Sequence, residues 1–165
     1  MIDSTTQSAN AKDSIVELPK NVKERLDTLV TELASILGDD LVSVIAHGSV
    51  VRGGWVDGVS DVDVVLVLKN ASFERLQTIG NPLQIARYSA RIEAMILEAG
   101  EIERAADAYP LLYDDIKDDH VVLYGGHPFA TLTIADDHRR IRIEQELREC
   151  QIRLRRAVTD ASGDV

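Results

Sequence analysis

The chain has 165 residues, a formal net charge of −10 and a single cysteine, Cys150. This length suits one domain with a buried core, and one cysteine excludes an intramolecular disulfide and is typical of a reducing compartment. The acidic balance disfavours nonspecific binding to nucleic acid or anionic membranes, and no basic-then-apolar leader or membrane-length apolar run is seen, so a cytoplasmic protein is expected.

Hydrophobic periodicity predicts an α/β chain in which helices alternate with short apolar strands. Residues 1–15 are polar and are expected to form a disordered tail. In chain order, the predicted elements are a helix over 21–37, a strand over 41–46, a turn over 48–54, a strand over 61–68, helical pieces over 72–90 that break around Gly80 and Pro82, a strand over 91–97, helical segments over 100–118 that break before Pro110, a strand over 121–124 and a helix over 134–158.

The last predicted helix has one apolar face, and arginines occupy much of the rest. One interpretation is a solvated helix with intrahelical ion pairs between arginine and glutamate. The other is a docking surface for an acidic partner or for a second subunit. The local charge is balanced, so a nucleic-acid arm is not expected. The apolar face is formed by Ile141, Leu147, Cys150, Leu154 and Val158.

The segment around residues 47–68 carries the strongest functional signal. A Gly48-Ser49 turn follows an apolar run directly, and eleven residues separate Ser49 from Asp61-Val62-Asp63, which opens a second apolar run. Strand side chains alternate between faces, so Asp61 and Asp63 are expected to point the same way. Adjacent carboxylates repel each other unless they are solvated or bridged by a divalent cation, and Mg²⁺ is commonly held by one or two carboxylates together with substrate phosphates.

This combination resembles the active-site signature of the polymerase-β-like nucleotidyltransferase superfamily, and above all its minimal, single-domain members. The matching segments are IAHGS and DVDVVLVL, at the spacing given above. The resemblance implies an α/β fold with a mixed β-sheet of about four or five strands and flanking helices, which we expect on one face. It also implies a nucleotidyltransferase domain over 16–130, followed by a C-terminal helix over 131–165 that is packed on the domain or used as an interface.

The activity implied by the resemblance is metal-dependent transfer of a nucleoside monophosphate, expected to be AMP from ATP, to a hydroxyl of a protein or small-molecule acceptor. The implied cofactor is Mg²⁺ or Mn²⁺. The implied catalytic and metal-binding carboxylates are Asp61, Asp63 and Glu93, and the implied nucleotide-binding residues are Gly48, Ser49 and Arg52.

Three of these assignments have alternatives. Glu93 is the expected third carboxylate because an acid within the otherwise apolar segment ARIEAMIL is costly unless it is used or solvated, but Asp114 and Asp115 compete for the role. Ser49 could instead be an ordinary helix N-cap. Arg52 could be a surface arginine rather than a contact for the triphosphate.

A different class of function is also compatible with the resemblance. The chain could be an antitoxin-like binding module that neutralises a small helical ribonuclease partner, with or without catalysis. Three intact carboxylates favour an enzyme. Antibiotic adenylylation usually requires an additional helical acceptor-binding domain, and none of adequate length is predicted. The acceptor, the nucleobase and the oligomeric state, including a homo-oligomer, stay open.

Overall fold

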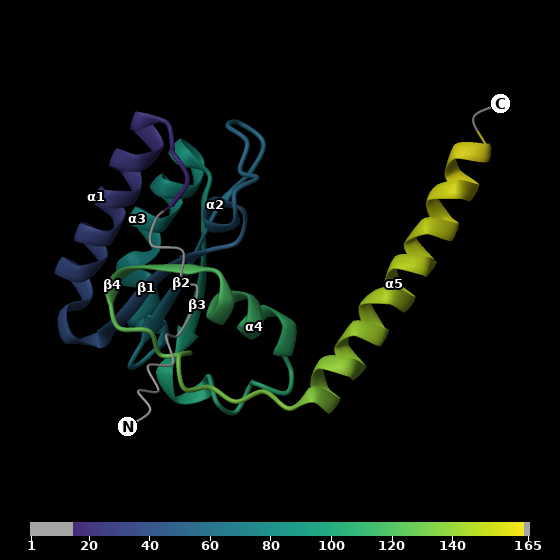
Figure 1. The fold of residues 1–165 in the computed structure, drawn as a ribbon. Helices are drawn as coiled ribbons and strands as arrows, with labels where there is room; N and C mark the ends of the chain where they lie inside the picture. Colours follow the sequence, from purple (N-terminus) through teal and green to yellow (C-terminus); the bar gives the residue numbers. More distant parts are fainter. Residues whose placement is uncertain (1–14, 164–165) are drawn as a thin grey trace, which may run out of the picture.

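A computed structural model describes residues 15–163 as a sheet with helices on both sides and a long helix at the C-terminal end (Figure 1). The predicted tail over 1–15 falls outside the described residues except for Ile15, which packs against the core. The elements are α1 (Lys20–Leu37), η1 (Gly38–Asp40), β1 (Leu41–His47), α2 (Ser49–Arg52), β2 (Val62–Leu68), α3 (Phe73–Ala90), β3 (Ile92–Glu98), η2 (Ala99–Glu101), α4 (Pro110–Asp118), β4 (His120–Gly125) and α5 (Asp136–Ser162).

The four strands form one mixed sheet in the order β3-β2-β1-β4. Strand β1 is antiparallel to both β2 and β4, whereas β2 and β3 are parallel and are connected by α3. The predicted mixed sheet with flanking helices and a C-terminal helix is therefore confirmed. As a consequence of the strand directions, the end of β1 and the beginnings of β2 and β3 lie at the same edge of the sheet.

One face of the sheet packs against α1 and α3. The apolar stripe of α1 recurs with helical period and is buried against alternate residues of β2, among them Val62, Val64 and Leu66. Each fully buried leucine or valine contributes on the order of 2 kcal/mol through removal of apolar surface from water. This alternation leaves Asp61 and Asp63 facing the other side of the sheet.

The other face of the sheet is covered as well, which corrects the expectation of helices on one face only. Val65 and Val67 of β2 and Ile45 of β1 pack against side chains from α4 and from the segment that follows β4, including Tyr113 and Phe129. The reason is visible in the strand itself: VDVVLVL is apolar at nearly every position after Asp63, so burial on a single face would leave valines exposed.

Helix α3 is continuous, so the predicted break around Gly80 and Pro82 is wrong. Pro82 lies inside the helix, is buried, and its carbonyl accepts a hydrogen bond of 3.1 Å from Nη2 of Arg25 on α1. An interior proline costs about 3 kcal/mol in an isolated helix. Here the contact of α3 with α1 along the sheet stabilises the helix in spite of that cost.

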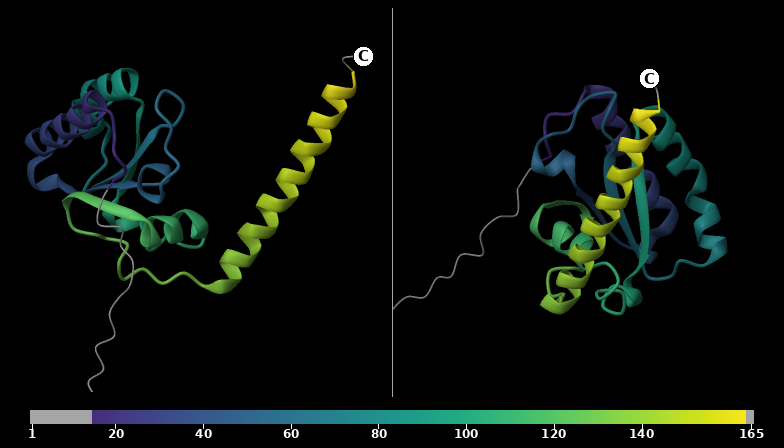
Figure 2. Two further views of the ribbon diagram at one scale, coloured as in Figure 1. Left: turned by 45° about the horizontal axis from the view of Figure 1, so that its top comes forward. Right: turned by 90° about the vertical axis from the view of Figure 1, so that its right-hand side faces the viewer.

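Helix α5 leaves the body of the protein (Figures 1 and 2). Its first turn is held by Arg139, which donates hydrogen bonds to both carboxylate oxygens of Asp114 on α4 at 2.6 and 2.8 Å. No residue of α5 is buried. Across residues 15–163, no helix combines the length and the hydrophobicity needed to cross a bilayer.

Candidate active site

The edge where β1 ends and β2 and β3 begin brings the predicted carboxylates together. Asp63 is the register partner of His47 on β1 and of Glu93 on β3. Register partners on neighbouring strands share a face and are about 4.8 Å apart across the sheet. Asp61 lies directly before β2, two residues from Asp63. The structure therefore places all three carboxylates at one edge, with Asp63 and Glu93 on the same face.

Burial and the neighbouring charges both act on Asp63. Partial burial raises the pKa of the Asp63 carboxyl above its ordinary value, and the neighbouring charges of Asp61 and Glu93 raise it further, while His47 and Arg52 act in the opposite direction. The net direction is upward. A site with this balance has an excess of negative charge that a bound cation would relieve.

His47 closes the site on the β1 side. The residue is buried, with 8% of its surface exposed, and burial lowers its pKa despite the opposing charges of Asp63 and Asp115. Its Nδ1 has no hydrogen-bond partner among the described residues. Burial therefore favours the neutral form of the imidazole.

The Gly48-Ser49 turn lies directly against Asp63. Gly48 has φ 74° and ψ −146°, a conformation that side chains rarely adopt, and an added Cβ would lie 2.9 Å from Oδ2 of Asp63. Glycine is thus required here both by the backbone and by the space. Gly48, not Ser49, is the N-cap residue of α2, and no side chain caps the helix, so the alternative reading of Ser49 as N-cap is wrong.

Two arginines without a predicted role neutralise two of the carboxylates. Arg91 Nη2 lies 2.8 Å from Oδ1 of Asp61 and also donates to the carbonyl of Val59. Arg87 Nε lies 2.8 Å from Oε1 of Glu93. The sequence offers one clue to Arg91, which is its place directly between a helix and a strand. In the structure, Arg91 ends α3 with φ 52° and turns the chain directly into β3.

The alternative third carboxylates lie in different surroundings. Asp114 is bound by Arg139 of α5. Asp115 pairs with Arg52, and its charge acts on His47. Arg52 therefore lies at the rim of the site, and Asp115, although it comes from α4, belongs to the same charged cluster.

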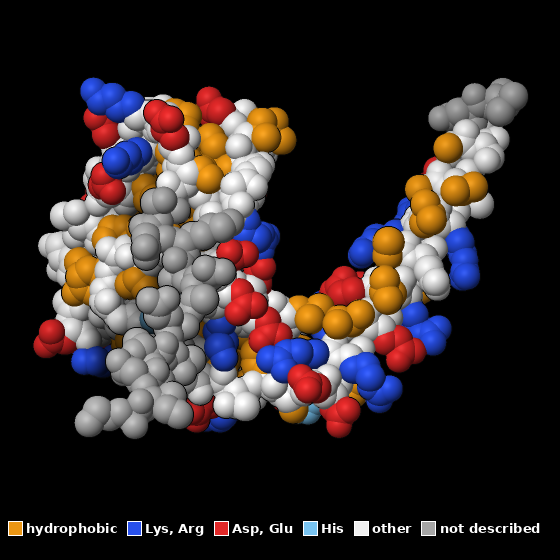
Figure 3. Space-filling model, in the orientation of Figure 1, with side chains coloured by type: hydrophobic (Ala, Val, Ile, Leu, Met, Phe, Trp, Pro, Cys, Tyr) orange, Lys and Arg blue, Asp and Glu red, His pale blue; other side chains and the backbone are white. Residues whose placement is uncertain are grey.

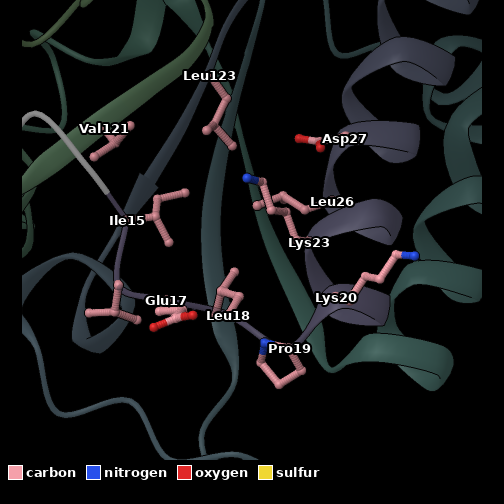
Figure 4. Close-up of a pocket in the computed structure, with 11 residues that line it drawn as sticks. Ile15, Glu17, Leu18, Pro19, Lys20, Lys23, Leu26, Asp27, Val121 and Leu123 are labelled. Carbon is pink, nitrogen blue, oxygen red and sulfur yellow. The ribbon is translucent and has the colours of Figure 1, made fainter.

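The cavity at this edge has a volume of about 380 Å³ and is open to solvent. Its lining combines polar groups from the strand beginnings with apolar side chains further along β3. A separate groove of about 820 Å³ lies between residues 15–19, α1 and β4, and none of the three carboxylates contributes to it (Figure 4). The cavity at the strand edge is lined by His47, Asp63, Val64, Glu93, Ala94 and Met95.

The donor chemistry of the three carboxylates suits a hard divalent cation, because Mg²⁺ and Mn²⁺ prefer oxygen ligands. Within residues 15–163, however, no three such side chains already lie in an arrangement that could hold a metal ion. Arg91 and Arg87 instead bind one oxygen each of Asp61 and Glu93. A cation at this edge would therefore compete with Arg91 and Arg87 for the carboxylates of Asp61 and Glu93.

Comparison with known proteins finds a family match over the part of the chain that contains these carboxylates. A family profile described as a nucleotidyltransferase domain matches residues 26–155. The fold is similar to that of spectinomycin adenyltransferase AAD(9) from Enterococcus faecialis, solved with ATP and spectinomycin, with a TM-score of 0.59 and 17% identity. The match covers 77% of this chain and 66% of that chain, so this chain spans just under two thirds of the length of that protein. A search of curated protein sequences gave no significant match.

More distant likenesses also occur among solved structures. One is a toxin–antitoxin complex with AMP-PNP, with a TM-score of 0.44, 14% identity, 81% of this chain covered and 98% of that chain. Another is a complex of tri-AMPylated Shewanella oneidensis HEPN toxin with MNT antitoxin, with a TM-score of 0.41, 12% identity, 84% of this chain covered and 98% of that chain.

Proposed function

Because the chain belongs to the nucleotidyltransferase domain family, whose profile covers residues 26–155, we propose that it transfers AMP from ATP to a hydroxyl group of a protein or small-molecule acceptor. The observation that carries the proposal is the register of Asp63 with Glu93, next to a glycine that packs against the Asp63 carboxylate. This places carboxylates from two strands beside a turn at which a phosphate chain can approach the backbone.

The roles follow from the position of each side chain. Asp61, Asp63 and Glu93 hold Mg²⁺ or Mn²⁺, and when bound the cation neutralises charge on the triphosphate. Gly48 allows the phosphates to come close to the backbone, and the Ser49 hydroxyl adds a donor. These groups fix the α-phosphate in line with the acceptor, and positioning of this kind is the main contribution of a protein to phosphoryl chemistry.

The third carboxylate is assigned to Glu93 rather than to Asp114 or Asp115. Glu93 lies across from Asp63 and lines the same cavity, whereas Asp114 is bound to Arg139. Glu93 is placed to complete the cation site or to accept the proton of the acceptor hydroxyl. Asp115 has a different task, because it holds Arg52 at the rim until the triphosphate competes for the guanidinium.

The presence of all three carboxylates at one edge favours catalysis over the binding-only alternative. A protein that acts only by binding a partner has no need to maintain acids around Asp63, whose pKa is raised by burial and further by the charges of Asp61 and Glu93. The acceptor in this proposal is a hydroxyl-bearing protein or small molecule.

Calorimetric titration with ATP tests the nucleotide site. We expect binding in Mg²⁺ and little or none in EDTA, because the triphosphate brings about four negative charges to an acidic site. Equal affinity in both solutions would contradict the assignment.

Mass spectrometry of a cell lysate incubated with the protein, ATP and Mg²⁺ tests transfer. An acceptor that gains the mass of an adenylyl group is expected with the wild type and with Asp114→Asn, and no such product with Glu93→Gln. If Glu93→Gln were active and Asp115→Asn inactive, Asp115 would be the third carboxylate.

A further inference from the structure

Helix α5 is the longest helix of the described structure, and most of its length packs against no other element. It is 27 residues long, none of its residues is buried, and it meets the body of the protein near its beginning, where Arg139 binds Asp114 and residues up to Gln145 line a shallow cavity with Asp107 and Ala108. Hydrophobic side chains follow its length between charged ones (Figure 3). Single helices in water gain most of their stability by packing an apolar face, and α5 has such a face exposed.

The apolar side chains of α5 contain a heptad pattern. Successive members are separated alternately by four and three residues, which is the spacing that places side chains along a narrow seam between two paired helices. The pattern continues over nearly three heptads. Its members are Ile143, Leu147, Cys150, Leu154, Ala157 and Ala161.

We propose that α5 pairs with α5 of a second copy of the chain, as an antiparallel two-helix coiled coil centred between Leu147 and Cys150. In this register Leu147 of one copy packs against Cys150 of the other, and Ile143 packs against Leu154. The centre of the pairing is close to the middle of α5, so the two helices overlap along nearly their whole length of about 40 Å.

Charges beside the seam favour this register. In an antiparallel pair, equivalent flanking positions of the two helices face each other, and here Glu146 faces Arg153 of the second copy, twice per dimer. A shift by one heptad would instead oppose Arg153 to Arg153 and Glu146 to Asp160. Opposite charges in the first case and like charges in the second select the proposed register.

The parallel orientation is disfavoured by the same residues. Parallel pairing would bring Arg140, which continues the heptad pattern toward the start of α5, against Arg140 of the other copy. It would also leave Glu146 opposite Gln151 and Arg153 opposite Val158. The antiparallel arrangement places Arg140 next to the small Ala157 instead.

The charge of the helix as a whole allows self-association. The chain has a net charge of −10, but α5 contains seven arginines and six acidic residues, a net charge of +1. Two copies of α5 can therefore approach each other without the repulsion that two acidic bodies would experience. A second copy is accordingly a better match for this helix than a strongly acidic or basic partner.

Sedimentation equilibrium of the full chain over a range of concentrations tests the pairing. The wild type is expected to shift from 18.2 kDa toward twice that mass. Leu154→Asp should weaken association at least about tenfold, because it places charge in the seam. Ile152→Asp is the matched control: Ile152 and Leu154 are both 63% exposed, but Ile152 lies outside the seam. A wild type that stays monomeric, or equal effects of the two substitutions, would overturn the proposal.

A charge exchange tests the register. Glu146→Arg and Arg153→Glu should each weaken the dimer, and the double variant should restore it, because the cross-helix pairs are then reversed. A parallel dimer would show no such restoration and would exclude the proposed arrangement. Circular dichroism of each variant confirms that the exposed substitutions leave the fold intact.

Cys150 supplies an independent measurement. The thiol is exposed in the single chain and lies in the proposed seam. Its rate of reaction with a thiol reagent should fall as the concentration of wild-type protein rises, and the fall should be absent in Leu154→Asp. A rate that is independent of concentration in a wild type shown to dimerise would place the dimer contact elsewhere.

Discussion

Gly48 and Asp63 are packed so closely that a Cβ added to Gly48 would lie 2.9 Å from Oδ2 of Asp63. The turn after β1 and the carboxylate on β2 therefore form one unit, in which the phosphate-binding turn also fixes the position of a proposed cation ligand. Because Gly48 has φ 74°, the backbone conformation and the contact both require glycine.

Replacing Gly48 with alanine should impair both stability and nucleotide binding. The backbone cost is about 1–3 kcal/mol, and in addition the Asp63 carboxylate must move away. Gly53→Ala is the matched control, since Gly53 also has positive φ, 81°, but has no atom within 4 Å of an added Cβ. Thermal melts and ATP titration in Mg²⁺ should show a loss of stability in both variants and a loss of affinity only in Gly48→Ala.

Asp63→Asn should abolish transfer and stabilise the metal-free protein at neutral pH. The native pKa of Asp63 is raised by burial, with further contributions from Asp61 and Glu93, so the native state favours the protonated form relative to the unfolded chain. The associated stability is present below the ordinary pKa and is lost as pH rises through the native pKa. At pH 7 the melting temperature of the variant should therefore be about 2–4 °C higher than that of the wild type. This corresponds to a free energy of unfolding that is larger by roughly 1 kcal/mol.

The same variant tests the cation site. Mg²⁺ with ATP should raise the melting temperature of the wild type and have little effect on Asp63→Asn. Equal shifts in both proteins would show that Asp63 is not a ligand of the cation.

Arg87→Gln should increase the affinity for Mg²⁺ about two- to fivefold. Arg87 neutralises Glu93 at 2.8 Å and competes with a cation for that carboxylate, but the pair is largely exposed and contributes less than about 1 kcal/mol. Arg75→Gln is the control, because Arg75 pairs with Asp40, at the opposite end of the strands. Titration with Mg²⁺ alone distinguishes the two variants, and identical affinities would exclude this competition.

Stability should decrease as pH falls from about 6.5 toward 4, in part because of His127. Burial lowers the pKa of His127 to about 4, and the nearby His120 and Lys117 add to the effect, with the two imidazole rings stacked at 3.9 Å. Between these pH values the unfolded chain binds the proton and the native state does not, so acid favours unfolding. Melting curves of His127→Gln should depend less on pH in this window, whereas exposed His138→Gln should behave as the wild type.

The local parts of the site were predictable from the sequence because they depend on short-range rules. Alternation in a strand was enough to place Asp61 and Asp63 on the face opposite to Val62 and Val64, and the turn chemistry of glycine was enough to predict a break after β1. The same alternation puts Glu93 on the face of Met95, which packs against the core on that side of the sheet.

Tertiary structure decided the features that depend on contacts distant in the sequence. Pro82 stays within α3 because that helix packs along α1, and Val65 and Val67 require α4 over the second face. The ion pair of Arg52 with Asp115 joins residues 63 positions apart. Propensity and periodicity describe each segment by its neighbours in the chain, whereas the counter-ions of a site are set by how whole elements pack, and long arginine side chains can reach a carboxylate from any of several directions.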